Sequence, residues 1–392
     1  MPLDNLLILP CGAIIKNRLV KSAMSDSLGN GKGNPSHEQI RLYERWAQGG
    51  IGLSIIGEVQ IASNHPEKPG NLVLGNQSDN EALEALTQRA SINGAHIWPQ
   101  LGHAGALSHL PISQPKGPSA LHIDDFHCDA MTIEEIENLP FIYAKAAKLA
   151  QNTGFTGIQI HAGHGFLLSQ FLSPLFNRRQ DEYGVSTKNR FRLIHAIILE
   201  VRKVVGPTFP IGIKLNASDL LEGGLTQEQA SQNIKMLDST SIDLIEISGG
   251  TYFPGAKSSS DSATKGVYYA NFAAKAKCLT DIPILLTGGI KHLEEAKEML
   301  TNRSADLIGV ARAMVLNPNL ANDWLSGIHP NPHFPRFENP PPEGITAWYT
   351  MRINAIALDQ DDDFSLPLNK AVKLYLDRDA QRSRIWNICF NS

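Results

Sequence analysis

The sequence predicts a single eight-fold β/α barrel, the TIM-barrel fold, with a C-terminal extension. Eight short segments rich in Ile, Leu and Val lack polar alternation, as buried parallel strands do. Longer amphipathic segments alternate with them, and four of these open with helix-start signals. Eight βα repeats favour a closed barrel over an open sheet. A barrel of this size commonly forms one domain, although 392 residues could make two or three.

The eight expected strands are Leu19–Ala23, Gly52–Ile56, His96–Leu101, Gly157–His161, Ile211–Leu215, Asp243–Ile247, Ile284–Leu286 and Asp306–Val310. The helix-start signals are capping boxes, in which a hydroxyl residue and a Glu or Gln three positions later satisfy two unpaired backbone donors. They pair Ser36 with Gln39, Ser78 with Glu81, Thr132 with Glu135, and Thr226 with Gln229. Each box opens a helix-like segment after a predicted strand, as the barrel requires.

Two stretches interrupt the repeat. Ser108–Ala130 contains three prolines and is expected to form a long loop over the active face. The stretch Gly327–Glu343 is rich in proline and asparagine, and it is followed by a predicted helix at Gly344–Leu358. The acidic run Asp359–Asp363 is expected to be a solvated surface. We therefore expect a barrel at 1–360 and a tail at 361–392 to which no role is assigned.

Composition excludes several classes of protein. The net charge of −4 and the lack of a basic block argue against a nucleic-acid partner. No apolar run approaches the ~20 residues that span a bilayer, so no membrane association is expected. The amino terminus has no basic leader, so it does not resemble a signal peptide. Four distant cysteines without a CxxC pair indicate a reducing compartment and no structural zinc, and we expect a cytoplasmic protein.

The carboxyl ends of the predicted strands carry polar or small residues, and this is where a barrel places its active site. Gly288 and Gly289 follow the seventh strand and allow the backbone to approach an anion closely. Arg312 follows the eighth strand and can hold a phosphate in a bidentate fork. Loops after these two strands often form a phosphate site in such barrels. The sequence therefore predicts a phosphorylated cofactor or substrate.

Polar side chains are also expected at the mouth of the barrel. Lys214 follows the fifth strand, and burying its charge without a partner would be costly. It could neutralise an anionic ring or form a Schiff base with a carbonyl substrate. Gln100, after the third strand, offers a donor and an acceptor that suit an imide-like edge.

Two histidines, His161 and His164, lie three residues apart just past the fourth strand, a spacing that places both side chains on one side. They could hold and polarise a substrate carbonyl oxygen. They could instead bind a metal, but His103 is the only obvious third ligand and no carboxylate accompanies it, so no metal is expected. Helix-capping or core positions are the remaining alternative.

Seven segments of the chain resemble the old yellow enzyme family of FMN-dependent ene-reductases. The longest and most specific is HAGHGFLLSQFLSPLFNRRQDEYG at His161–Gly184. The others, in the family's order, are Lys16–Asp26, Gly49–Val59, Gln100–Gly105, Gly212–Asp219, Ile247–Tyr252 and Asp306–Leu320. The resemblance covers residues 1–360 and implies non-covalent FMN in the barrel mouth, with NADH or NADPH as the reductant.

The resemblance also implies a role for each matching residue. Lys214, where the family usually has arginine, would stabilise negative charge at N1 of the reduced ring. Gln100 would read the pyrimidine edge, and His161 and His164 would bind the oxygen of the substrate. The strand that packs on the flavin matches Ala23, Met24 and Ser25, and the phosphate loops match Gly288, Gly289, Gly309, Ala311 and Arg312.

Three positions depart from the family pattern: Phe166, Ala106 and Val185. Only the first bears on the reaction, because Phe166 stands where most members have a tyrosine that donates a proton to the substrate. Tyr252, which we place in the substrate pocket with Phe166, or Tyr268 or Tyr269 could supply a replacement hydroxyl.

We therefore expect an NAD(P)H oxidoreductase that reduces a small molecule, most simply an activated alkene such as an enone. Two alternatives stay open: a flavin-binding barrel without ene-reductase turnover, and a Schiff-base aldolase that uses Lys214. Homo-oligomer formation is also left open.

Overall fold

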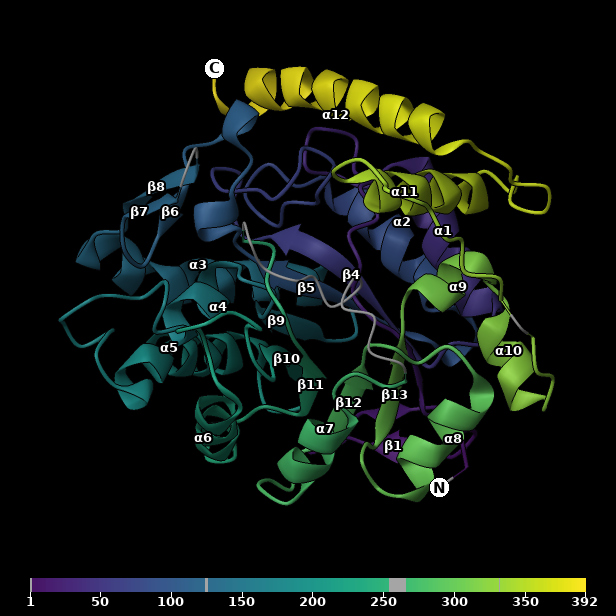
Figure 1. Ribbon diagram of the computed structural model, residues 1–392, viewed down its shortest axis with the longest axis horizontal. Coiled ribbons are helices and arrows are strands. Elements are labelled where there is room, and N and C mark those ends of the chain that lie inside the picture. Colours follow the sequence, from purple (N-terminus) through teal and green to yellow (C-terminus); the bar gives the residue numbers. More distant parts are fainter. Residues whose placement is uncertain (1, 124–125, 254–265, 331) are drawn as a thin grey trace.

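The protein folds into a closed barrel of eight parallel strands, as the sequence predicts (Figure 1). The computed structural model describes residues 2–123, 126–253, 266–330 and 332–392. The barrel strands are β3 (Leu19–Lys21), β4 (Leu53–Gln60), β5 (His96–Gly102), β9 (Ile158–Ala162), β10 (Ile211–Asn216), β11 (Leu244–Ser248), β12 (Ile284–Thr287) and β13 (Leu307–Val310). Each pairs in parallel with the next, and β13 closes the barrel onto β3.

Helices follow the strands and form the outer layer of the barrel (Figure 1). They are α1 (His37–Gln48), α2 (Asn80–Ala90), α3 (Ile133–Asn152), α4 (Leu167–Leu172), α5 (Thr187–Val205), α6 (Gln227–Leu237), α7 (Ala270–Lys277), α8 (Leu293–Thr301), α9 (Arg312–Leu316) and α10 (Leu320–Leu325). Three short 3₁₀ turns lie at Ile92–Gly94, Gly105–Leu107 and Leu110–Ile112. Of the described helices, none is both long and apolar enough to cross a membrane.

The barrel interior has an apolar layer and, above it, a polar layer. The hairpin of β1 (Leu7–Ile8) and β2 (Ile14–Ile15) supplies residues that pack with the apolar layer. That layer includes Val20, Leu53, Ile55, Trp98, Leu244, Leu285 and Leu307. Residues two positions apart on a strand point to the same side. The next inward positions are therefore Ser22, Gln100, Glu246, Thr287 and Gly309, joined by Gln159 and Lys214 from neighbouring strands. The polar layer lies on the carboxyl-end side, where chemistry is expected.

Two of the four expected capping boxes are complete, and a third is half formed because the Gln39 amide donates to Asp26 instead. Thr132 with Glu135 and Thr226 with Gln229 form complete capping boxes, and the Ser36 hydroxyl accepts from the backbone N–H of Gln39. The fourth prediction, a box opened by Ser78, is wrong. Asp79 caps α2 by accepting from the backbone N–H of Ala82, while the Ser78 hydroxyl donates to the Val73 carbonyl. The carboxylate of Asp79 is one residue closer to the helix, so it satisfies the first-turn donor instead.

The segment expected to be a long loop, Ser108–Ala130, contains a small sheet. Its strands are β6 (Lys116–Gly117), β7 (Leu121–Ile123) and β8 (Phe126–Ala130), with β8 in the middle. Leu121 and Cys128 pack in one cluster with Phe176 and Phe253, which gives the sheet an apolar face to bury. The segment still contributes to the active face, because His109, Pro111, Pro115, Ile123 and Phe126 line the cavity described below.

Two C-terminal helices follow the barrel. α11 (Gly344–Ala357) matches the predicted helix, and α12 (Leu368–Phe390) runs across the top of the view in Figure 1. The indole of Trp386 on α12 is fully buried and donates to the carbonyl of Ser63, 3.2 Å away. Only a tail of unknown role was expected here, whereas α12 is a helix that packs on α11.

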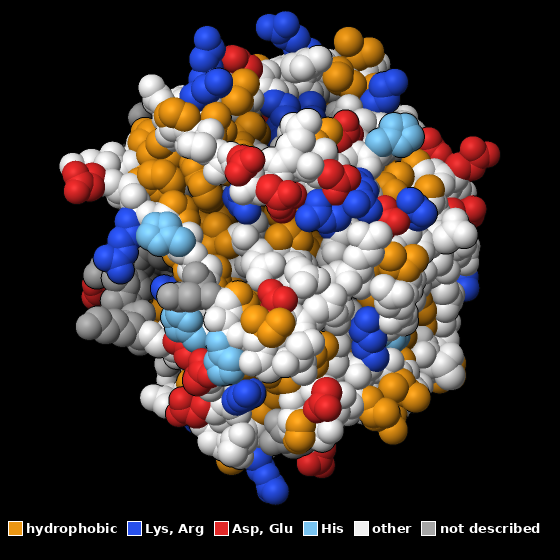
Figure 2. All heavy atoms as spheres, turned by 90° about the vertical axis from the view of Figure 1, so that its right-hand side faces the viewer, with side chains coloured by type: hydrophobic (Ala, Val, Ile, Leu, Met, Phe, Trp, Pro, Cys, Tyr) orange, Lys and Arg blue, Asp and Glu red, His pale blue; other side chains and the backbone are white. Residues whose placement is uncertain are grey.

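The acidic run was expected to be a solvated surface, but part of it forms ion pairs with α1. Asp359 contacts Arg41 at 2.9 Å and Arg45 at 2.6 Å, and Asp361 contacts Arg45 at 3.2 Å. Asp359, Asp362 and Asp363 are exposed as expected, whereas Asp361 is buried. The ion pairs were not expected because a run of like charges carries no information about partners distant in sequence. Acidic and basic side chains lie close together on the face shown in Figure 2, which includes this side of the molecule.

Candidate active site

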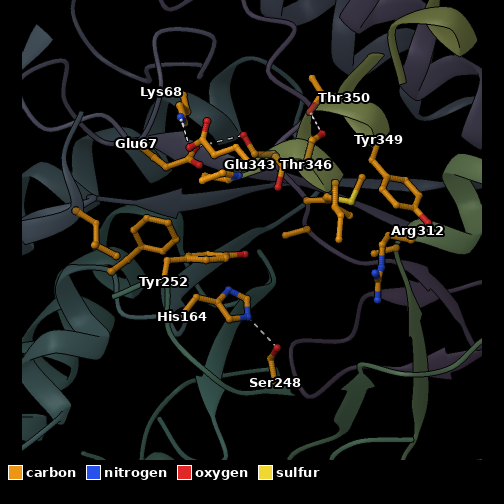
Figure 3. Close-up of a pocket in the computed structure, with 18 of the residues that line it drawn as sticks. Glu67, Lys68, His164, Ser248, Tyr252, Arg312, Glu343, Thr346, Tyr349 and Thr350 are labelled. Carbon is orange, nitrogen blue, oxygen red and sulfur yellow. Dashed lines mark hydrogen bonds and ion pairs between the residues drawn. The ribbon is translucent and has the colours of Figure 1, made fainter. Parts of the chain in front are cut away.

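A cavity of about 1300 Å³ opens at the carboxyl ends of the barrel strands. Its walls come from the residues that follow β3, β9, β12 and β13, and from the loop at Ser108–Pro115. The C-terminal part of the chain completes it with Glu343, Tyr349 and Tyr375. Figure 3 shows Tyr252 and His164 on one side of this space and Arg312 with Tyr349 on the other. The cavity therefore has two ends with different chemistry.

Most of the residues singled out from the sequence line this cavity. They are Ala23, Met24, Ser25, His164, Phe166, Lys214, Tyr252, Gly288, Gly289, Gly309, Ala311 and Arg312. Gln100 and His161 do not line it. Both are buried, and each bonds to a neighbour instead: Gln100 to Gln159, and His161 to His164. Gln100 was expected to point into the barrel mouth, and the sequence did not give its depth. His161 was expected just past the fourth strand, but it lies within β9 (Ile158–Ala162).

The Arg312 end of the cavity has a glycine-lined wall. Gly288 has φ +118° and Gly289 has φ +84°, a region in which side chains are strained. A Cβ on Gly309 would lie 2.0 Å from Oγ1 of Thr287, so no larger residue fits there. The guanidinium of Arg312 lies 5.9 Å from the centre of the Tyr349 ring. Bare backbone beside an arginine suits the phosphate of a cofactor.

Lys214 stands at the floor of the cavity and is almost fully buried. Its Nζ lies 3.1 Å from Oε1 of Glu246, which has no exposed surface. The same oxygen accepts a hydrogen bond from Thr287 at 2.7 Å, and Oε2 accepts from Gln159 at 2.6 Å. Gln159 in turn accepts from Gln100 at 2.7 Å. The ammonium is therefore held in one place by a fully bonded carboxylate.

The two histidines form a connected pair. Nε2 of His161 lies 3.3 Å from Nδ1 of His164, and Nε2 of His164 lies 2.8 Å from the hydroxyl of Ser248. The backbone N–H of His164, a residue in the left-handed region at φ +59°, donates to Oδ1 of Asn216. Burial, with the nearby charge of Lys214, holds the pKa of both imidazoles well below the usual value. Both rings are neutral near pH 7.

His103, considered as a third metal ligand with these two, is engaged elsewhere. Its ring stacks on that of His65 at 4.5 Å, and its Nδ1 accepts from the backbone N–H of Gly105. Within the described part of the chain, no group of three or more His, Cys, Asp or Glu residues could hold a metal ion.

Two buried carboxyls lie near the histidine end. Oε1 of Glu58 lies 3.1 Å from Nδ1 of His161, and burial raises the pKa of Glu58 to about 8. Glu67 accepts a hydrogen bond from the Ser25 hydroxyl at 3.2 Å, and burial together with the charge of Glu58 raises its pKa to about 7. Both groups hold protons close to neutral pH.

Phe166 and Tyr252 form the wall beside His164. The Phe166 ring lies 5.0 Å from that of His161 and 5.8 Å from that of Tyr252. The centre of the Tyr252 ring lies 5.7 Å from that of His164, and Figure 3 shows the two side chains next to each other. Tyr252 is largely exposed. Of the other two tyrosines considered, Tyr268 lines the cavity, whereas Tyr269 is buried against Gly249 and Gly288.

Several residues of the site escaped the sequence analysis. Glu246 is a lone carboxylate in an apolar strand, and that costly placement is a signal that could have revealed it. No local sequence pattern brings Glu67 and Lys68 together with Glu343, because Glu343 is far away in the sequence. In the structure, Nζ of Lys68 lies 3.0 Å from Glu343 and 5.5 Å from the centre of the Tyr375 ring.

A glycine-lined wall beside an arginine, a paired lysine and a neutral imidazole face one cavity at the carboxyl ends of the strands. Fold and site are thus those of a barrel enzyme. The sequence profile of the NADH:flavin oxidoreductase / NADH oxidase family matches residues 12–331, and the chain belongs to this family. It is an NAD(P)H-dependent flavin oxidoreductase of the old yellow enzyme type, as its motifs predict.

Known relatives support this assignment. The chain is 32% identical over 347 residues to the NADH-dependent flavin oxidoreductase iliE of Hypocrea jecorina, covering 80% of this chain and 86% of the relative. It is 35% identical over 317 residues to an NADPH dehydrogenase of Halalkalibacterium halodurans, covering 78% and 89%. A solved complex of 2-naphthoyl-CoA reductase with 2-naphthoyl-CoA superposes with a TM-score of 0.78 at 26% identity, over 83% of this chain and 52% of that one. The chain thus spans about half the length of that reductase.

Proposed function

We propose that the chain binds FMN in this cavity, takes hydride from NADH or NADPH, and reduces an activated alkene such as an enone. The observation that carries the proposal is the placement of His164. A neutral imidazole, fixed through its two ring nitrogens by His161 and Ser248, lines the same cavity as Lys214 and the glycine wall. A carbonyl oxygen that takes the place of the Ser248 hydroxyl beside Nε2 could accept a hydrogen bond from this ring.

The cavity has residues suited to each part of the cofactor. Arg312, Ala311 and the three glycines would hold the phosphate, because bare N–H groups and a guanidinium favour an anion there. Ala23, Met24 and Ser25 would pack on the ring, and Lys214 would stabilise negative charge on it. Gln100 is buried behind the wall, linked to Lys214 through Gln159 and Glu246, and would meet the ring's edge only by turning its amide toward the cavity. FMN, when bound, supplies the hydride-transfer chemistry.

The residues of the chain act on the acceptor. A hydrogen bond from His164 withdraws electrons from a carbonyl and makes the alkene carbon two atoms away accept hydride. A proton must then reach the carbon beside the carbonyl, and Phe166 has none to give. Tyr252 stands in the cavity next to His164 and Phe166, so its hydroxyl is the donor that we propose.

The first test is the absorbance spectrum of the purified protein, followed by anaerobic titration with NADH and NADPH. A yellow protein bleached by one nucleotide and reoxidised by 2-cyclohexenone supports the proposal. A yellow protein that no nucleotide bleaches, or that no enone, quinone or nitro compound reoxidises faster than buffer does, would instead be a flavin-binding barrel without turnover. A colourless protein that also fails to bind added FMN rules out the flavin site.

A further inference from the structure

Glu246 is a buried acid in the middle of β11 that does not itself line the cavity but bonds two residues that do, Lys214 and Thr287. Both of its oxygens are used: Oε1 meets Lys214 at 3.1 Å and Thr287 at 2.7 Å, and Oε2 accepts from Gln159 at 2.6 Å. Neither Lys214 nor Glu246 is more than 1% exposed. A charge buried this deeply is retained only with a partner, because an unpaired ion loses its hydration.

The pair stands in a region with few other charges. The titratable groups that feel the charge of Lys214 include Lys21, Glu58, His161 and His164. Burial favours the neutral form of each: it lowers the pKa of Lys21 to about 8, raises that of Glu58 to about 8, and keeps both histidines uncharged. A pKa of about 8 leaves Lys21 mostly protonated near pH 7, but its ammonium faces the rings of Tyr43 and Trp46, and Lys21 does not line the cavity. At the cavity floor the field is therefore set chiefly by the ammonium of Lys214 and the carboxylate beside it.

We propose that Glu246 is a positioning residue that aims the Lys214 ammonium at the cavity and, as its counter-charge, lowers the reduction potential of a flavin bound there. Lys214 lines the cavity and Glu246 does not. The lysine would therefore attract negative charge that develops on a reduced ring, while the glutamate offsets part of that attraction. This inference rests on the proposed flavin site, but it assigns a function to a residue outside that site's wall.

The test is a set of four proteins: wild type, Glu246→Gln, Lys214→Met and the double variant. The midpoint potential of bound FMN is measured by spectroelectrochemical titration, and FMN content by absorbance. Glu246→Gln should favour reduced flavin about tenfold, a rise of about 30 mV for a two-electron couple. Lys214→Met should shift the equilibrium the other way by a similar factor. The double variant, which removes a neutral pair, should return close to wild type.

This compensation separates charge balance from a merely structural role. A merely structural role predicts loss of folded protein or of FMN content, without shifts of the midpoint potential in opposite directions in the two single variants. Replacing both members of a buried pair is usually tolerated better than replacing one. If Glu246→Gln does not accumulate as folded protein, Lys214→Met and the double variant still decide the question. The double variant must then have a higher midpoint potential than Lys214→Met.

Asp243→Asn is the matched control. Asp243 is also buried and paired, with Arg202 at 2.7 Å, but it precedes β11 at the amino end of the strand. Its substitution should leave the potential unchanged. An unchanged or lowered potential in Glu246→Gln, with FMN content near wild type, overturns the inference and leaves the proposed function standing. Wild-type protein that binds no FMN overturns both.

Discussion

Nε2 of His161 lies 3.3 Å from Nδ1 of His164, and this contact makes the two imidazoles one unit. Both rings are neutral, so each carries a single N–H, and only one of the two facing nitrogens can donate to the other. The tautomer of the buried His161 therefore determines which nitrogen of His164 carries a proton. His161, which does not line the cavity, thus determines which nitrogen of His164 can donate a hydrogen bond to an acceptor.

Replacing both histidines with alanine should weaken the binding of phenols, which present an oxygen like that of an enone. The loss of a hydrogen bond of about 1.4 kcal/mol predicts about tenfold weaker binding. Spectral titration of the bound flavin with 4-hydroxybenzaldehyde measures this, and FMN content should stay near normal. The control is His96→Ala, at the amino end of β5, where the ring bonds the Ile14 carbonyl. Equal losses in both variants would contradict the assignment.

The variant Phe166→Tyr should speed the oxidative half-reaction with a simple enone and leave flavin reduction by NAD(P)H little changed. The reason is that a positioned general acid typically contributes ~10²–10⁴ to rate. The Phe166 ring lies 5.8 Å from that of Tyr252, so a new hydroxyl would enter the same part of the cavity. Stopped-flow measurement of each half-reaction checks this.

The complementary variant is Tyr252→Phe, which removes the donor that we propose for the native enzyme. It should slow enone reduction but spare the reduction of a quinone, which needs no proton at carbon. If enone reduction is fast in wild type and unaffected in both variants, the proton comes from elsewhere and Phe166 is only a wall of the pocket.

The raised pKa of Glu58 predicts a pH dependence of stability. The folded protein holds this proton up to about pH 8, whereas an unfolded chain releases it near 4.5. The native state therefore binds more protons between these values, and this group's contribution to stability falls as pH rises through that window. A tenfold difference in proton affinity between the folded and unfolded states corresponds to about 1.4 kcal/mol.

Glu58→Gln removes this titration, so its unfolding free energy relative to wild type should improve steadily from pH 5 to pH 8. Urea unfolding at several pH values measures the difference. The control is Glu38→Gln on α1, because the pKa of Glu38 is lowered, chiefly by a backbone hydrogen bond. Its titration lies below pH 5, and its difference from wild type should be flat. A flat profile for Glu58→Gln as well would show that Glu58 is ionised in the folded protein.

Truncating Trp386 on α12 should destabilise the protein by about 3 kcal/mol, the usual cost of replacing a buried aromatic residue with alanine. The indole is fully buried and bonded to Ser63. Leu376→Ala on the same helix is the control, because Leu376 is 53% exposed and should cost under about 0.5 kcal/mol. Chemical denaturation gives both values. Similar values for the two would mean that α12 adds little to the stability of the barrel.

The barrel could be predicted because its signals are local. Buried parallel strands appear as apolar runs, and a capping box needs only two residues of the same turn. The error at Ser78 is also local: Asp79 offers a better acceptor one position later. α12 escaped prediction because its contacts, such as the one from Trp386 to Ser63, join residues far apart in sequence.

The site was only partly predictable for a related reason. Strand alternation shows which residues point inward, and so it found Lys214 and Gln100. It does not show how deep each lies, so Gln100 was expected in the wall and is found behind it. Glu67 and Glu343 belong to loops whose paths depend on the whole fold.

The hydrogen bonds that lead from Glu246 through Gln159 to Gln100 have a fixed direction. A carboxylate can only accept, so Gln159 must turn its amide nitrogen toward Glu246 and its oxygen toward Gln100. Gln100 must then give one N–H to Gln159, which leaves it a carbonyl oxygen and a second N–H for other partners. The orientation of the Gln100 amide is thus set by Glu246, which lies two hydrogen bonds away. A ligand edge that alternates donor and acceptor would be recognised in only one orientation.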